Sequence, residues 1–153
     1  MNWDFIDLLI RDLESSKQTK PITFSVKHGI PEELKGSRGV YIIKQVKGEP
    51  QAAFNEYNVY RENNENLNCP PLNQKPNHIL YVGRHKDDIR KRLAEHLVKA
   101  SDTTSALRLN EWGTADYEID VYLFPDINPN LLQIIEACFA EQMQPAFGQH
   151  GKI

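Results

Sequence analysis

The chain has 153 residues, of which 40% are apolar and 25% charged, and its formal net charge is −3. That length suits one domain over residues 1–153 with its own core, and the acidic total argues against a wholly basic nucleic-acid binder without excluding a local basic patch. No apolar stretch approaches the roughly 18 residues of a membrane span, and the N-terminus lacks the basic start of a secretory signal, so we expect a cytoplasmic protein.

The first part of the chain, residues 1–36, is predicted to be an N-terminal extension. Apolar residues within 3–16 fall on one stripe with charges opposite, which is typical of an amphipathic helix packed on the outside of a domain. Residues 22–26 have the composition of a short strand. The turn at 29–31 then leads into a single helical turn.

Two longer strands are predicted at 39–44 and 78–84, where β-branched and aromatic residues gather. Tyr41 lies in the middle of the first strand. Because side chains alternate along a strand, Tyr81 and Gly83 lie on a common face of the second. Gly83 removes a side chain where its strand ends, so another group can approach the backbone closely.

Residues 45–77, between these two strands, form a long polar insertion with eight asparagines and four prolines. No periodicity runs through the insertion, so we expect either a functional loop or a partly disordered segment. Phe54, Tyr57 and Tyr60 would give it a small anchor on the body of the domain.

The remaining elements carry most of the candidate functional residues. A helix is predicted at 87–100, with Arg92 and His96 four positions apart on one face. A third strand follows at 117–124, and a last helix at 129–143 begins with a proline at its first position. Together these elements predict an α+β fold with a small three-stranded antiparallel sheet flanked by helices.

Glu136 falls on the inward stripe of the last helix, in line with Leu132, Phe139 and Met143. A buried carboxylate without a partner would cost several kcal/mol or take up a proton. Two explanations stay open. The carboxylate pairs with Arg92 or with a tyrosine hydroxyl, or it ligates a hard divalent ion, which prefers oxygen donors.

Arg92 lies nine residues after Gly83, so a strand, a turn and a helix would return it to the end of the strand. Its planar guanidinium makes two hydrogen bonds to a phosphate and keeps its charge, and His96, one turn further on, exchanges protons near neutral pH. Either residue alone would be interpreted as structural. Tyr41 and Tyr81 would likewise be ordinary strand aromatics, since a tyrosine is a poor base unless cations lie nearby.

Three segments together resemble the GIY-YIG nuclease superfamily: GVY at 39–41, YVGRHKDDIRKRLAEHL at 81–97 and EACFAEQMQPAFGQ at 136–149. The second segment is similar to the excision-repair nuclease version, and the superfamily also includes restriction and homing endonucleases. The resemblance covers roughly residues 37–149. It implies that the first two motifs lie on adjacent antiparallel strands, and that the chain is an endonuclease hydrolysing phosphodiester bonds of duplex or branched DNA with Mg²⁺ or Mn²⁺.

The resemblance also assigns roles to individual residues. The catalytic positions that it implies are Tyr41, Tyr81, Arg92, His96 and Glu136, and the positions that contact substrate are Gly83, Arg84 and Lys91. Glu136 would hold the metal ion. Tyr41, with help from His96, would activate the attacking water, and Arg84 and Arg92 would stabilise the charge on the phosphate.

Two departures from the family pattern are visible. The first two motifs are normally much closer together than Tyr41 and Tyr81 are, and such a long spacing is similar to that of restriction enzymes with insertions. Gly148 occupies the place of an expected asparagine, for which Gln149 or His150 would have to substitute. The alternative to an endonuclease is a catalytically degenerate module of the same fold that binds nucleic acid or another protein.

Targeting has to come from the insertion at 45–77, from homodimerisation or from a partner protein, because no separate DNA-binding domain is visible. Both ends of the insertion join strands that carry the site, so we expect it to contact substrate or a second subunit. Its asparagines can bond to base edges or phosphates, and Tyr57 and Tyr60 can stack on a base or pack on a partner. A solvated loop without a role is the other interpretation.

Overall fold

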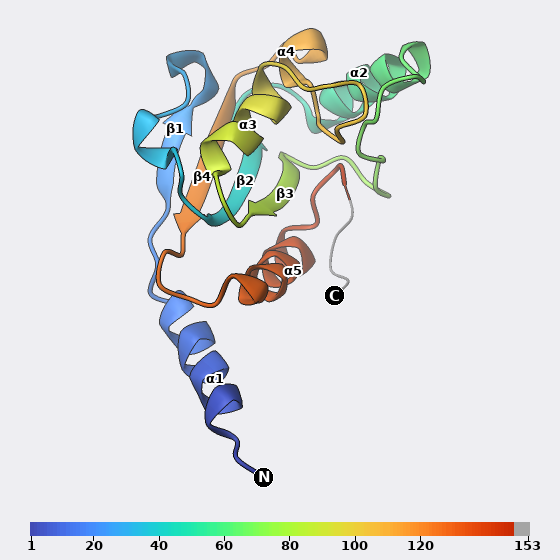
Figure 1. Cartoon of the computed structure of the whole chain (residues 1–153). Helices are drawn as coiled ribbons and strands as arrows, with labels where there is room; N and C mark the ends of the chain where they lie inside the picture. Colours follow the sequence, from blue (N-terminus) through green and yellow to red (C-terminus); the bar gives the residue numbers. More distant parts are fainter. Residues whose placement is uncertain (149–153) are drawn as a thin grey trace.

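The computed structural model describes residues 1–148, which Figure 1 traces from the N-terminal helix to the segment behind the last helix. The helices and strands in chain order are α1 Asp4–Ser16, β1 Ile22–Ser25, β2 Gly39–Gln45, α2 Pro50–Asn63, β3 Ile79–His85, α3 Ile89–Leu97, α4 Leu109–Trp112, β4 Tyr117–Leu123 and α5 Leu132–Met143. Short 3₁₀ turns lie at Val26–His28, Glu32–Leu34 and Pro129–Leu131. The fold is α+β.

The strands form one antiparallel sheet in the order β1-β4-β2-β3, so β2 and β4 are central and β3 lies at an edge. The prediction of a three-stranded sheet is therefore wrong by one strand. The segment predicted as a short strand at 22–26 joins the sheet as β1, where Phe24 pairs with Ile119 of β4. Phe24 is buried in the core, and burying this apolar surface is the physical reason why the short strand belongs to the sheet.

The two motif strands, β2 and β3, are adjacent and antiparallel, as expected, with Tyr41 opposite Gly83. The glycine is required here because a Cβ at position 83 would collide with the hydroxyl and ring of Tyr41. Gly83 therefore makes room for a side chain of the neighbouring strand, and not only for an incoming group.

Helices cover both faces of the sheet (Figure 1). On one face, Tyr41 and Ile43 of β2 belong to a core that includes residues of α2, α3 and α4. On the other face, Val40 and Ile42 pack with residues of α5. The alternation along β2 thus divides the interior into two cores and places Tyr41 on the side of α3.

The insertion at 45–77 is not a patternless loop, because it contains α2, which begins at Pro50. Tyr57 of this helix is fully buried, donates its hydroxyl to the carbonyl of Pro70 at 2.6 Å and packs against Trp112. The expected aromatic anchor is confirmed. The idea that Tyr57 stacks on a base is wrong, since its ring belongs to the core.

The asparagines at the end of the insertion bond to the protein backbone. Asn73 donates to the carbonyl of Pro145 at 2.8 Å, and Asn77 donates to two carbonyls at the end of α5. The N–H of Gly148 in turn donates to the carbonyl of Pro71 at 2.8 Å. The insertion is thereby fastened to the segment behind α5, which itself bonds to the first residues of β3.

The amphipathic helix expected at 3–16 is confirmed as α1, which projects away from the sheet (Figure 1). Leu9 and Leu13 pack partly against the core on the α5 side, while Trp3 and Phe5 are exposed. No helix within residues 1–148 is both long and apolar enough to cross a membrane.

Candidate active site

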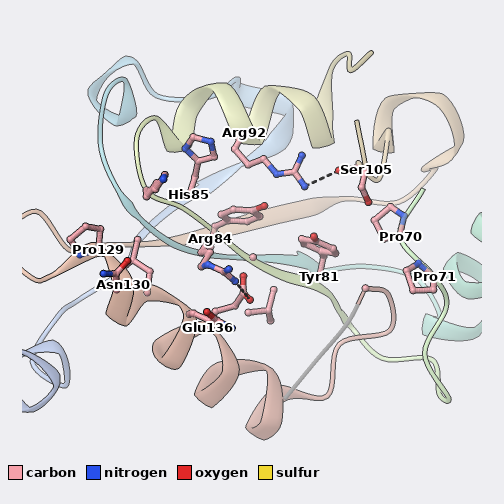
Figure 2. A pocket seen from close by; sticks show the side chains of 17 residues that line it. Pro70, Pro71, Tyr81, Arg84, His85, Arg92, Ser105, Pro129, Asn130 and Glu136 are labelled. Carbon is pink, nitrogen blue, oxygen red and sulfur yellow. Dashed lines mark hydrogen bonds and ion pairs between the residues drawn. The ribbon is translucent and has the colours of Figure 1, made fainter. Parts of the chain in front are cut away.

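A cavity of about 860 Å³ opens at the β3 edge of the sheet, between α3 and α5 (Figure 2). Six of the residues proposed from the sequence line it: Tyr41, Tyr81, Gly83, Arg84, Arg92 and Glu136. They come from β2, β3, α3 and α5, so the fold gathers side chains that are far apart in the sequence. Of the other two, Lys91 is exposed away from the cavity wall, and His96 is fully buried.

The cavity wall is positively charged although the whole chain is acidic. Arg84, Lys86 and Arg92 line it with His85 beside them, and Glu136 is the one carboxylate among the described lining residues. Three cations around one carboxylate create a positive potential that attracts an anion such as a phosphate. His85 and Lys86 were not singled out from the sequence, although they lie in the basic run that follows the second motif.

Glu136 forms an ion pair with Arg84, whose Nη1 lies 2.7 Å from Oε1 of the carboxylate. Figure 2 shows the two side chains pointing at each other across the cavity wall. Burial raises the pKa of Glu136, and the guanidinium of Arg84 opposes that rise. Arg92, one of the partners considered from the sequence, pairs with Glu95, so Glu136 has an ion pair with a different arginine.

Glu136 is also the group on which a metal ion would be held. Within residues 1–148, no cluster of three or more His, Cys, Asp or Glu side chains is arranged to bind a metal. Mg²⁺ does not need such a cluster, because it keeps several waters and is usually held by one or two carboxylates together with substrate phosphates. A half-buried carboxylate facing a wide cavity fits this ion once Arg84 gives way.

Tyr41 and His96 form a buried hydrogen bond of 2.9 Å between Oη and Nε2. Its direction follows from the other ring nitrogen, Nδ1, which accepts the N–H of Leu107 at 3.1 Å. A nitrogen that accepts a hydrogen bond carries no proton, so the neutral ring has its proton on Nε2 and donates it to Tyr41. Burial, reinforced by the charge of Arg92, holds the pKa of His96 well below its usual value, so the ring is neutral at physiological pH.

The hydroxyl of Tyr41 thus accepts a bond from His96, and its own proton remains for another partner. The ring stacks on that of Tyr81, with centroids 6.2 Å apart. Burial raises the pKa of both tyrosines, and Arg92 opposes the rise in each case. Both hydroxyls are therefore protonated near neutral pH, and each can donate a hydrogen bond to an anion in the cavity.

Two hydrogen bonds, one from each terminal nitrogen, hold the guanidinium of Arg92. Nη2 donates to the carbonyl of Ser105 at 2.8 Å, and Nη1 donates to Glu95 at 3.3 Å. Figure 2 shows the side chain extended from α3 toward Ser105. Sequence reasoning could not find Ser105, because the residue contributes a backbone carbonyl and no side-chain pattern marks it.

Gly148 lines the cavity at the place where the sequence resemblance expects an asparagine. Its φ of 87° lies in the left-handed region, and a Cβ there would lie 2.7 Å from Cε2 of Tyr81. The ring of Tyr81 thus leaves no room for a side chain at this position. The proposed substitutes, Gln149 and His150, lie outside the described residues.

The chain matches no protein-family model, and no curated protein matches it either. The interpretation of the cavity therefore depends on its geometry and on the three sequence motifs.

Proposed function

We propose that this chain is a divalent-metal-dependent endonuclease of the GIY-YIG superfamily that hydrolyses phosphodiester bonds in DNA. The observation that supports this most is that residues of all three motifs line one positively charged cavity, from Tyr41 on β2 to Arg92 on α3 and Glu136 on α5. Each of these residue types is common on its own. Their convergence on one cavity is what distinguishes a site from scattered structural residues.

The cationic side chains of the cavity would bind the scissile phosphate. Arg92 is already oriented by Ser105 and Glu95, and its remaining N–H groups can make charge-assisted bonds to phosphate oxygens. Groups that are fixed before the reaction are the most effective at stabilising charge in the transition state. The hydroxyl of Tyr81 would position the scissile group by donating a further hydrogen bond.

Glu136 would hold Mg²⁺ or Mn²⁺, which when bound polarises the phosphate and stabilises the leaving oxygen. Its ion pair with Arg84 has to open first. Once released, Arg84 is available to the phosphate, so a substrate that brings negative charge into the cavity also favours release of the carboxylate.

Tyr41 would take the proton of the attacking water only after it has released its own hydroxyl proton to solvent in the cavity, and the transfer would return it to the neutral form. Before the transfer, its charged oxygen would be stabilised by the Nε2–H of His96 and by the nearby positive charge of Arg92, since hydrogen bonds to a charged form and opposite charges both favour it. His96 therefore helps Tyr41 by stabilising its charged form. It does not accept the proton, because Nδ1 is already occupied by Leu107.

The experiment that tests this proposal incubates the purified chain with plasmid, single-stranded and branched DNA in Mg²⁺ or Mn²⁺. Glu136→Ala should abolish cleavage, whereas Glu141→Ala, at an exposed position of the same helix, should cut like wild type. Cleavage that persists unchanged in Glu136→Ala would sink the assignment. DNA binding without cleavage by wild type would favour the degenerate binding module, for which the glycine at position 148 is the supporting observation.

A further inference from the structure

The loop between α3 and α4, residues 98–108, reaches the candidate site through two backbone groups. The carbonyl of Ser105 accepts a hydrogen bond from Nη2 of Arg92 at 2.8 Å. The N–H of Leu107 donates to Nδ1 of His96 at 3.1 Å. Because both are main-chain groups, their positions depend on the path of the loop and not on which side chains stand at 105 and 107.

Arg108 holds this loop from the inside. The residue is only 4% exposed, and its terminal nitrogens donate to the carbonyls of Ala100, Ser101 and Thr104 at 3.1, 2.8 and 2.9 Å. Within residues 1–148, every hydrogen bond of this guanidinium goes to a backbone carbonyl, and none goes to a carboxylate. The side chain therefore gathers the loop around itself.

Two features of Arg108 cost free energy and indicate that the loop is held in one conformation. A buried guanidinium has lost its hydration and needs hydrogen bonds to replace it. Arg108 also has a φ of 55°, in the left-handed region that non-glycine residues adopt rarely. Backbone conformations of this kind persist where the surroundings over-determine them, and they cluster near functional sites. The fork of several donors that binds these carbonyls together is a property of arginine that lysine lacks.

The same loop is bound to the insertion through Asn68. The carbonyl of Asn68 accepts from Arg108 at 3.4 Å. The backbone N–H of Asn68 donates to the carbonyl of Asp102 at 2.9 Å, and the side-chain amide of Asn68 donates to the carbonyl of Thr103 at 2.9 Å. The prolines at 70–71, which follow closely in the chain, line the cavity. Loop and insertion thus form one unit beside the site.

We propose that Arg108 is a positioning residue that sets the tautomer of His96 and the direction of Arg92 by fixing the loop that precedes it. If the loop moved, Nδ1 of His96 would lose its donor and could carry the ring proton. Nε2 would then accept a hydrogen bond from the Tyr41 hydroxyl instead of donating one to it, and the charged form of Tyr41 would lose a stabilising bond. The catalytic part of this inference rests on the proposed function, whereas the tautomer does not.

The test compares Arg108→Met and the milder Asn68→Ala with wild type, each labelled with ¹⁵N. Long-range ¹H–¹⁵N correlation spectra show which ring nitrogen of His96 carries the proton, with neither DNA nor metal present. We expect the proton on Nε2 in wild type, at least partly on Nδ1 in Arg108→Met, and a smaller shift in the same direction in Asn68→Ala. Asn68 is exposed, so this variant should fold even if Arg108→Met does not.

The kinetic arm measures cleavage of DNA under saturating Mg²⁺. Arg108→Met should lower kcat about 10- to 100-fold, by analogy with the loss of activity when the outer partner of a functional histidine is removed. The change in KM should be smaller, because Arg108 does not line the cavity. Phe24→Leu, which loosens the core at the opposite edge of the sheet, controls for lost stability and should change neither the tautomer nor kcat.

Three results would overturn the inference. They are a wild-type ring that carries its proton on Nδ1, an unchanged tautomer in both Arg108→Met and Asn68→Ala, and a shifted tautomer in Arg108→Met with the kcat of wild type. If the tautomer shifts as expected but wild type cleaves no DNA, the proposed function fails and the effect of Arg108 on His96 stands.

Discussion

Arg84→Met should bind Mn²⁺ more tightly than wild type when no DNA is present. A metal ion and Arg84 compete for one carboxylate, because Nη1 of the arginine lies 2.7 Å from Oε1 of Glu136. Methionine keeps an unbranched side chain of moderate length but carries no charge, so the variant leaves Glu136 to the ion.

The size of the gain follows from the strength of the ion pair. Two unit charges about 4 Å apart attract each other by about 4 kcal/mol at an effective dielectric constant of 20. The side chain of Arg84 is 40% exposed and that of Glu136 23%, and solvent-exposed pairs contribute at most about 1 kcal/mol in measurements. We therefore assign about 1 kcal/mol to the ion pair between Arg84 and Glu136. Removing this competition corresponds to a gain of about fivefold in affinity for Mn²⁺.

The assay is a titration of free Mn²⁺ by its electron paramagnetic resonance signal. It is run at pH 8, so that the raised pKa of Glu136 does not leave the carboxyl protonated. Lys86→Met removes another cation of the same cavity and is the matched control, with a change of less than twofold. An equal gain in both variants, or none in Arg84→Met, would refute direct competition for the carboxylate. Arg84→Met should also cleave DNA more slowly, since it has lost a phosphate ligand.

Three further outcomes follow from burial in the site. Glu136→Gln should be more stable than wild type at pH 7, because burial raises the pKa of the carboxyl and folding then favours its protonated form. This gain should vanish near pH 4, where wild type is protonated too, and thermal melts at both pH values check it. His96 has the opposite pH dependence, because folding depresses its pKa. Its contribution to the free energy of unfolding is complete above the unfolded pKa of 6.5 and is lost as the pH falls, by at most about 1.4 kcal/mol per pH unit. In urea titrations between pH 7.5 and 5, His96→Gln should reduce the fall in the free energy of unfolding. The control His28→Gln, at an exposed position, should show the same fall as wild type. Gly83→Ala should be destabilised by about 1–3 kcal/mol, because its Cβ would collide with Tyr41; a wild-type melting temperature would show that the ring can move aside.

The strands and the last helix around the site were predictable from local sequence signals. β-Branched and aromatic residues located β2 and β3, alternation located β4, and Pro129 marked the approach to α5. The helix α2 was missed because its fully buried residues are few. Ala53 and Tyr57 are four apart, and two positions do not show a helical period against a polar background.

The sequence predicted which residues form the candidate site better than it predicted which of them contact one another. Arg92 was one of the partners considered for Glu136, but α3 and α5 cover opposite faces of the sheet (Figure 1). Arg84, at the end of the edge strand, lies closer to the carboxylate. The direction of the bond between His96 and Tyr41 depends on the N–H of Leu107, and a backbone donor leaves no trace in the amino-acid sequence.

The two departures from the GIY-YIG pattern are physically connected. The N–H of Gly148 donates to the carbonyl of Pro71 at 2.8 Å, so the glycine that replaces the expected asparagine is bound to the insertion itself. The side-chain space at 148 is filled by the ring of Tyr81, and Tyr57 anchors the insertion in the core. Position 148, the insertion and Tyr81 are therefore coupled. A side chain introduced at 148 would displace the ring of Tyr81 and strain the bond to Pro71, so it would disturb the cavity wall and the insertion together.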